Sequence, residues 1–193
     1  MGGEAKLCAA FEGTRRIAAG DLASVAAEVK RVLDRGETAP VLIFDDETSE
    51  QVEVDFRGTV EDVLARLRPE MSPPGAEAEE PRGPGRPKLG VVAREVTLLP
   101  RHWEWLGEQS GGASAALRRL VEDARRSNAD KDRVRKARES AYRFLSTMGG
   151  NLPGFEEANR ALFAGDAAKF DREVEAWPPD VRDHARKLAR ASF

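Results

Sequence analysis

Two histidines, one cysteine and several neighbouring carboxylates are the residues of this chain that could do acid–base, nucleophilic or metal chemistry. His184 directly follows Asp183 and lies four residues after Asp180, a spacing at which a carboxylate can orient an imidazole. The sequence places no evident nucleophile beside this pair. The second histidine, His102, is too distant in sequence to suggest a shared zinc site, and a single cysteine, Cys8, permits no internal disulfide. We therefore expect no catalytic residues, no metal site and no cofactor, and predict that the protein is not an enzyme.

Charge divides the chain into three zones. Residues 1–81 hold 9 Lys+Arg and 18 Asp+Glu, residues 82–143 hold 15 and 8, and residues 144–193 hold 7 and 8. The corresponding net charges are −9, +7 and −1, within a chain whose total is −3. A basic centre of this kind would attract a polyanion. The alternative that charge alone leaves open is a helix-rich stretch solvated by arginine.

The first 68 residues predict an acidic α/β module. Asp21 is placed to cap one helix, and Thr59 and Asp62 form a capping box before a second helix. The alternation of Val52 and Val54 with polar residues is typical of a strand with one buried face. The expected elements are strands at residues 6–11, 14–18, 40–44 and 51–56 and helices at residues 22–35 and 60–67, in the order ββαββα.

Residues 69–90 contain six prolines and four glycines and almost no large apolar side chain, a composition that predicts a linker. Within it, Pro84-Gly85-Arg86-Pro87-Lys88 resembles the core of an AT-hook, whose Gly-Arg-Pro segment lies extended in the minor groove of A·T-rich DNA. Arg82 lies further out on the same segment. The alternative is a plain Pro/Gly linker, although a basic arm at this place would add affinity for DNA in either case.

Residues 91–127 follow the order strand, helix, glycine turn, helix. Val91–Leu99 alternates as a strand, Pro100 precedes a helix, and Gly111-Gly112 predicts a tight turn before a second helix at Ser114–Ser127. The run Gly111-Gly112-Ala113-Ser114-Ala115-Ala116-Leu117-Arg118-Arg119-Leu120-Val121 matches the glycine, serine cap, arginine and apolar pair of the ribbon-helix-helix family of bacterial DNA-binding repressors. The segment therefore resembles that family over about a fifth of the chain.

The resemblance implies that strands from two chains pair as an antiparallel ribbon that enters the major groove of double-stranded DNA. A lone strand leaves its backbone groups unpaired, so a homodimer is required. Side chains on the outer face of the ribbon would contact bases, while the start of the second helix and nearby arginines would contact phosphate. The candidate DNA-binding residues are Arg82, Arg86, Lys88, Ala93, Glu95, Thr97, Gly112, Ala113, Ser114, Arg118 and Arg119.

Aromatic residues on the first helix of this unit predict how it packs. Trp103 and Leu106 are three residues apart and are expected to be buried together, whereas Trp105 and His102 share the other side of the helix, where they could meet the partner chain. The alternative is that Gly111-Gly112 merely joins two helices of a bundle and that the arginines face solvent.

Residues 129–193 predict a helical bundle, with a helix at Asp130–Met148 followed by three shorter ones. The stretches Asn151-Leu152-Pro153-Gly154-Phe155 and Trp177-Pro178-Pro179-Asp180-Val181, and the chain as a whole, resemble a bacterial family of uncharacterised proteins, which implies no particular activity.

These observations predict an α+β protein with four parts: an acidic module at 1–68, a linker at 69–90, a strand-helix-helix dimerising unit at 91–128, and a helical bundle at 129–193. We expect a DNA-binding protein, a transcriptional regulator that acts as a homodimer. The alternative is a non-enzymatic interaction or scaffolding module that dimerises without nucleic acid. The acidic module could bind a ligand or a protein partner. No apolar run approaches the roughly 20 residues of a membrane-spanning helix, and no export signal is evident, so we expect a cytoplasmic protein.

Overall fold

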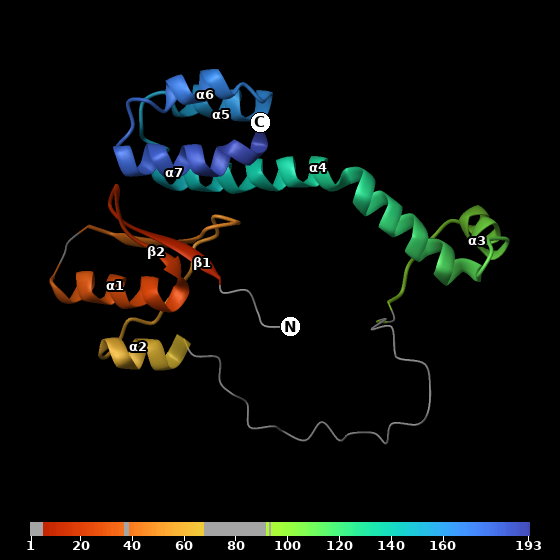
Figure 1. The fold of residues 1–193 in the computed structure, drawn as a ribbon, viewed down its shortest axis with the longest axis horizontal. Helices are drawn as coiled ribbons and strands as arrows, with labels where there is room; N and C mark the ends of the chain where they lie inside the picture. The colour runs from red at the N-terminus through yellow and green to blue at the C-terminus, as the bar shows by residue number, and fades with distance from the viewer. Residues whose placement is uncertain (1–5, 37–38, 68–91, 93) are drawn as a thin grey trace. The chain divides into compact units, whose positions relative to one another are not determined.

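The computed structural model describes residues 6–36, 39–67, 92 and 94–193 (Figure 1). It divides into two compact units. The first joins Met1–Pro69 with Asp130–Phe193, and the second is Glu70–Ala129.

The described residues form a mixed α+β fold that is mostly helical, as the sequence predicts. A three-stranded antiparallel sheet near the N-terminus is followed mainly by helices. The strands are β1 (Leu7–Glu12), β2 (Arg15–Asp21) and β3 (Val41–Asp45); the helices are α1 (Leu22–Asp34), α2 (Val60–Leu67), α3 (Pro100–Gly107), α4 (Gly112–Met148), α5 (Phe155–Ala164), α6 (Ala167–Glu173) and α7 (Pro179–Ala189), with a closing 3-10 turn, η1 (Arg190–Ser192).

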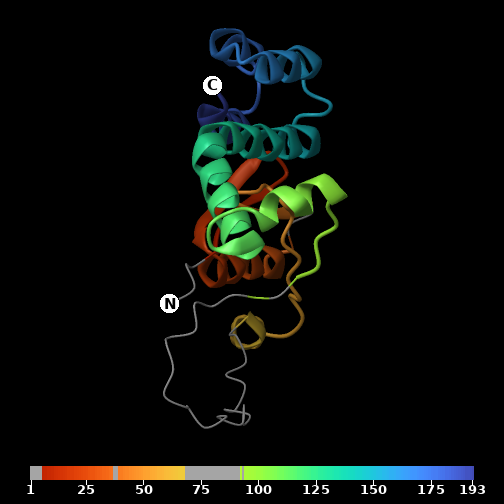
Figure 2. The ribbon, with the colours of Figure 1, turned by 90° about the vertical axis from the view of Figure 1, so that its right-hand side faces the viewer.

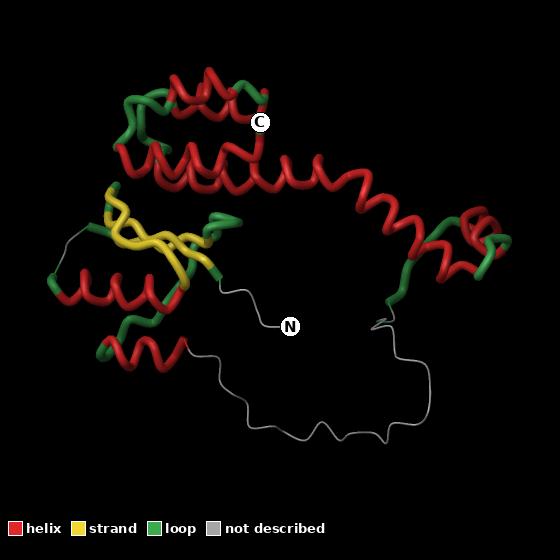
Figure 3. The backbone as a smooth tube through the Cα atoms, in the orientation of Figure 1, coloured by secondary structure: helices red, strands yellow, loops and turns green. Residues whose placement is uncertain are grey.

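The sheet of the first unit lies between two helical layers. Its strand order is β2-β1-β3, so β1 is central. Because successive side chains of a strand point to opposite faces, Cys8 and Ala10 pack on one side with α1, whereas Ala9 and Phe11 pack on the other side with the C-terminal helices. Figure 3 shows the strands with helices on both sides. Both faces of β1 are therefore buried, which explains why its sequence lacks polar alternation.

Two local signals for helix starts are confirmed. Asp21 accepts a hydrogen bond from the backbone N–H of Ser24 at 3.0 Å and caps α1. Thr59 and Asp62 form the expected capping box, with the Asp62 N–H donating to Thr59 Oγ1 at 3.2 Å and the Thr59 N–H donating to Asp62 Oδ2 at 2.9 Å.

The strand expected at residues 51–56 does not form, so the order is ββαβα and not ββαββα. Its pairing with β3 is limited to the bridge between Phe44 and Gln51 and a bond from the Val52 N–H to the Ile43 carbonyl at 2.8 Å. Beyond Val52, the Arg66 guanidinium of α2 binds the Asp55 carbonyl at 2.9 Å. The alternating apolar side chains are still packed against the core, so burial accounts for the pattern without a hydrogen-bonded ladder.

The two helices expected at Ser114–Ser127 and Asp130–Met148 are one continuous helix, α4, of 37 residues. The intervening Asn128 and Ala129 contain no helix breaker. Ion pairs one turn apart support this exposed stretch, including Arg125 with Glu122 at 3.2 Å and Arg133 with Asp130 at 3.1 Å. The division between the two compact units falls after Ala129, within this helix.

Residues of the N-terminal sheet and of residues 130–193 share one hydrophobic core, although the sequence predicts two separate parts, 1–68 and 129–193. The ring centroid of Phe144 on α4 lies 5.4 Å from that of Phe11 and 5.3 Å from that of Phe44. Figure 2 shows the short helices α5 and α6 side by side at the far end of this unit. Aromatic residues from the two ends of the chain thus form a single core.

Polar contacts surround the same interface. The Arg16 N–H, on edge strand β2, donates to Asp180 Oδ2 of α7 at 2.8 Å. Lys187 pairs with Asp46, and the Ser49 and Ser140 hydroxyls lie 2.9 Å apart in a buried hydrogen bond. These contacts fix the register of the sheet against α4 and α7.

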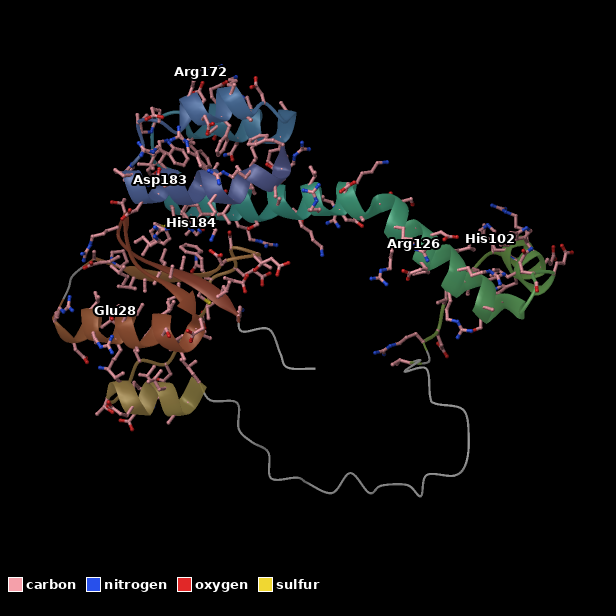
Figure 4. All side chains as sticks on the ribbon, in the orientation of Figure 1. Glu28, His102, Arg126, Arg172, Asp183 and His184 are labelled. Carbon is pink, nitrogen blue, oxygen red and sulfur yellow. The ribbon has the colours of Figure 1, made fainter. Side chains whose placement is uncertain are left out.

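His184 lies in this core and not in an acid–base pair. It is 1% exposed, and its ring centroid lies 4.6 Å from that of Phe144 and 5.3 Å from that of Phe11. Figure 4 shows His184 on α7, and neither of its ring nitrogens has a hydrogen-bond partner among the described residues. Asp183 pairs instead with Arg182 at 2.9 Å. Burial, reinforced by the positive charge of Lys187, lowers the pKa of His184 to about 4.

Replacing His184 by Phe should remove an acid-dependent loss of stability. The imidazole has an ordinary pKa of 6.5 when the chain is unfolded and about 4 when it is folded, so the unfolded chain binds the proton more readily. Stability from this group is complete above pH 6.5 and falls as the pH drops towards 4, by about 3 kcal/mol at about 1.4 kcal/mol per pKa unit.

Denaturant unfolding between pH 7 and pH 4 measures this difference. The wild type should lose about 3 kcal/mol more than His184→Phe over that range, and His102→Ala, which changes the second histidine, should behave as the wild type. Equal pH dependence in all three proteins would show that the buried imidazole does not control acid stability.

Candidate nucleic-acid interface

The second unit is built on a glycine turn between α3 and α4. Pro100 occupies the first turn of α3, and Leu99 precedes it with extended backbone, φ −67° and ψ 150°. Gly111 and Gly112 have φ of 83° and 73°, a left-handed conformation that favours glycine. The Gly112 N–H donates to the Gln109 carbonyl at 2.9 Å, which closes the turn. The glycine pair is thus required by the backbone.

This unit has very little core of its own. Leu106 and Ala116, 2% and 3% exposed, are the buried side chains among residues 92 and 94–129. Beside them is an open apolar hollow of about 250 Å³, lined by Leu98, His102, Trp105, Leu106, Leu117 and Leu120. Large apolar side chains also remain exposed; they are Val92, Val96, Leu99, Trp103, Trp105, Leu120 and Val121.

The arrangement of the tryptophans differs from the expected one. Trp103 is 43% exposed and does not line the hollow, so the expected burial of Trp103 with Leu106 is wrong. Trp105 and His102 lie around Leu106 instead. The spacing of three residues grouped Trp103 with Leu106, because spacing alone does not identify which face of α3 packs against α4.

Residues 94–99, in the strand expected at Val91–Leu99, form no strand within the chain. Glu95 and Thr97 are exposed, Val96 is 54% exposed, and Leu98 is half-buried at the hollow. This strand is expected to pair with the same strand of a second chain, so its backbone groups are expected to lack a strand partner in a single chain.

The start of α4 carries most of the predicted phosphate contacts. Because α4 begins at Gly112, Ser114 lies inside the first turn and is not the helix cap. The N–H groups of Ala113 and Ser114 have no acceptor within the helix, as at every helix start, whereas that of Gly112 is already used by Gln109. The groups at this helix start that could contact a phosphate are therefore the N–H groups of Ala113 and Ser114 and the side chains of the arginines that follow.

Arg118 and Arg119 lie one turn further along α4. Arg118 is exposed, and Arg119 folds back so that its Nη2 donates to the Ser110 carbonyl at 3.1 Å. An open surface hollow is lined by Arg118, Arg119, Glu122, Asp123 and Arg126. Sequence reasoning missed Arg126, labelled in Figure 4, although its spacing of eight residues from Arg118 places both on one helix face. Arg126 Nε lies 3.9 Å from Glu122, which also pairs with Arg125.

Seven of the predicted site residues lie in this one small unit; they are Glu95, Thr97, Gly112, Ala113, Ser114, Arg118 and Arg119. Arg82, Arg86, Lys88 and Ala93 lie outside the described residues. In the part of the chain that the structure describes, no cluster of three His, Cys, Asp or Glu residues could hold a metal ion. Within the same part, every helix is too short or too polar to cross a membrane.

Comparison with known proteins shows the family to which the chain is similar. The family described as "Uncharacterized protein conserved in bacteria (DUF2239)" matches residues 7–189. No curated protein and no solved structure matches the chain. The ribbon-helix-helix resemblance of residues 91–127 therefore stays a prediction from its own motifs.

Changing Gly111 to Ala should loosen the α3–α4 turn. An L-residue at φ 83° costs about 1–2 kcal/mol, and the new Cβ would lie 3.1 Å from Ala115 Cβ. Gly107→Ala is the matched control, because Gly107 has no positive φ and no atom within 4 Å of a new Cβ. Amide hydrogen exchange at Leu106 should accelerate roughly 5- to 30-fold in Gly111→Ala and change little in Gly107→Ala. Equal rates in the two variants would contradict the turn geometry.

Proposed function

Since the chain belongs to the DUF2239 family of uncharacterised bacterial proteins, as its C-terminal stretches predicted, we propose a function from its own surface. The protein is a DNA-binding transcriptional regulator that acts as a homodimer through residues 91–128. Such a regulator would act in the cytoplasm. The acidic residues 1–68 remain a candidate site for a ligand or protein partner.

One observation carries the proposal: a single small unit exposes both a segment with no strand partner and an arginine-bearing helix start. Residues 94–99 leave Glu95 and Thr97 exposed, and the first turns of α4 present the Ala113 and Ser114 amides with Arg118. Groove-reading proteins use these two kinds of surface together, base contacts to specify and phosphate contacts to position.

In the proposed complex, two copies of residues 91–99 pair and enter the major groove. Thr97 would donate to or accept from a base edge, Glu95 would accept from a cytosine amino group, and Ala93 would offer a methyl contact. The amides at the start of α4 and Arg118 would hold a phosphate. The basic residues Arg82, Arg86 and Lys88 precede the strand in sequence and would add phosphate contacts.

The second candidate function is a dimerising interaction module that binds no nucleic acid. Acidic side chains on α4 favour it, because Glu122 lies within ion-pair distance of Arg125 and Arg126, and Asp123 lines the same surface hollow. These carboxylates compensate part of the positive charge that would otherwise attract phosphate.

Salt dependence separates the two functions. Fluorescence anisotropy of the full chain with genomic DNA fragments, at several salt concentrations, should give a logarithmic slope of about −0.9 for each phosphate contacted. Arg118→Ala should reduce the slope by about 2, since each copy of the dimer loses one contact. Arg172→Ala removes one exposed arginine from the first unit and should leave the slope unchanged. Absence of wild-type binding at low salt would favour the interaction module.

Thr97→Ala should instead change sequence preference. The side chain is exposed in the predicted base-reading row, so its loss should weaken selected fragments relative to random ones by about 1–3 kcal/mol per base pair read, with the salt slope retained. Competition between a selected and a random fragment measures this. A uniform loss for both fragments would place Thr97 outside base recognition.

A further inference from the structure

We propose that the apolar hollow between α3 and α4 receives a second copy of this chain, with Trp105 as the anchoring side chain of the interface. The inference rests on the dimer of the proposed function, and it adds a helix-to-helix contact to the predicted pairing of strands. The hollow and Trp105 belong to the second unit of the same chain.

The small core of this unit requires additional burial. Its described residues bury only Leu106 and Ala116. The described part of the unit, residues 92 and 94–129, is 37 residues long. Folded units below about 40 residues usually need a disulfide, a metal or association with another chain to be stable. The single cysteine of the sequence, Cys8, lies in the first unit, and no metal cluster occurs among the described residues. Association with another chain would supply the burial that the described residues lack.

The lining of the hollow has the chemistry of an interface core. It contains leucines, Trp105 and His102, and no Asp, Glu, Lys or Arg. Trp105 and Leu120 stand at its rim, 49% and 47% exposed. Tryptophan is the side chain most enriched among residues that dominate binding energy, because it buries a large rigid surface.

Two features favour a second copy as the occupant. First, the patch contains both a hollow and a half-exposed Trp105 that lines it, so a two-fold axis can bring each Trp105 against the hollow of the other copy. Second, the two segments carry opposite net charge. Residues 100–108 hold Glu104 and Glu108 against Arg101, whereas residues 112–121 of α4 hold two arginines and no acidic residue. Among the described residues, Glu104, Glu108 and Arg118 have no ion pair, so α3 and its cap in one copy can lie opposite the start of α4 in the other.

The boundary of the proposed interface lies on α4 just past Leu120. Every residue from Val121 to Arg133 is exposed. Between Glu122 and Arg133, ion pairs such as Arg125 with Glu122 and Arg133 with Asp130 lie along the helix surface. Such a charged stretch stays solvated without a partner. The second copy therefore contacts about the first three turns of α4.

Two tryptophans on the same helix allow a matched test. Trp105 and Trp103 are similarly exposed, 49% and 43%, but only Trp105 lines the hollow. In sedimentation experiments on the full chain over a concentration series, Trp105→Ala should raise the dimer dissociation constant at least 10-fold. Trp103→Ala should change it less than 3-fold. A wild type that is monomeric throughout, or equal effects of the two substitutions, would overturn the proposal.

A second pair of variants, on α4, tests the interface without changing α3, so that local unfolding of α3 cannot explain the result. Leu120 lines the hollow and its neighbour Val121 does not, although both are exposed. Leu120→Ala should weaken the dimer as Trp105→Ala does, and Val121→Ala should not. Unchanged dimerisation in Leu120→Ala would overturn the proposal even if Trp105→Ala dissociates.

DNA binding is measured on the same proteins by anisotropy. A wild type that dimerises through Trp105 but binds no DNA would refute the proposed function and leave this inference intact. A wild type that binds DNA as a dimer insensitive to Trp105→Ala would refute the inference and leave the proposed function intact.

Discussion

The first unit depends on the packing of the central sheet against α4 and α7. Phe11 and Phe44 from the strands meet Phe144 and His184 from the helices, with ring centroids 4.6 to 6.1 Å apart. Because this contact occupies one face of the sheet, α1 must cover the other, and β1 must be apolar on both sides. Among the described residues neither ring nitrogen of His184 has a hydrogen-bond partner, and the ring is tolerated there because in its neutral form it fills aromatic space; its burial is the main cause of its lowered pKa.

Helix α4 also extends into the second unit, where its residues pack against no comparable hydrophobic core among the described residues. Near its C-terminal end α4 buries Phe144 and Leu145, whereas its first turns leave Leu120 and Val121 half exposed. A single hydrophobic residue exposed to water is ordinary, but here two exposed apolar residues, Trp105 and Leu120, line one hollow. In the proposed dimer this apolar surface would be buried between the two copies, and Leu98 of residues 94–99 lines the same hollow.

Local chemistry was predictable from sequence, and long-range contacts were not. Asp21 and Thr59 mark helix starts through bonds that span three residues, and Gly111 marks a turn through its own backbone. The contact of Phe11 with Phe144 joins residues that no sequence periodicity links, so the shared core of the chain's two ends went unseen. The prediction of a strand at 51–56 was wrong for a related reason. Alternation of apolar and polar residues indicates that one face is buried, but it does not indicate backbone hydrogen bonds to a neighbouring strand.

The same distinction applies to the candidate site. Local spacing in the sequence is enough to predict the glycine turn and the position of Arg118. The predicted strand would form only by pairing with a second copy, so its geometry cannot be derived from one chain. In the proposed function, formation of the dimer and binding to DNA depend on each other. Residues 94–126 hold six basic and five acidic side chains, so this stretch by itself has little net attraction for a phosphate backbone. Two copies held at a fixed spacing would present two helix starts at once, and the second contact would then form at high effective concentration. Affinity for DNA would thus depend on how firmly the dimer is held more than on net charge.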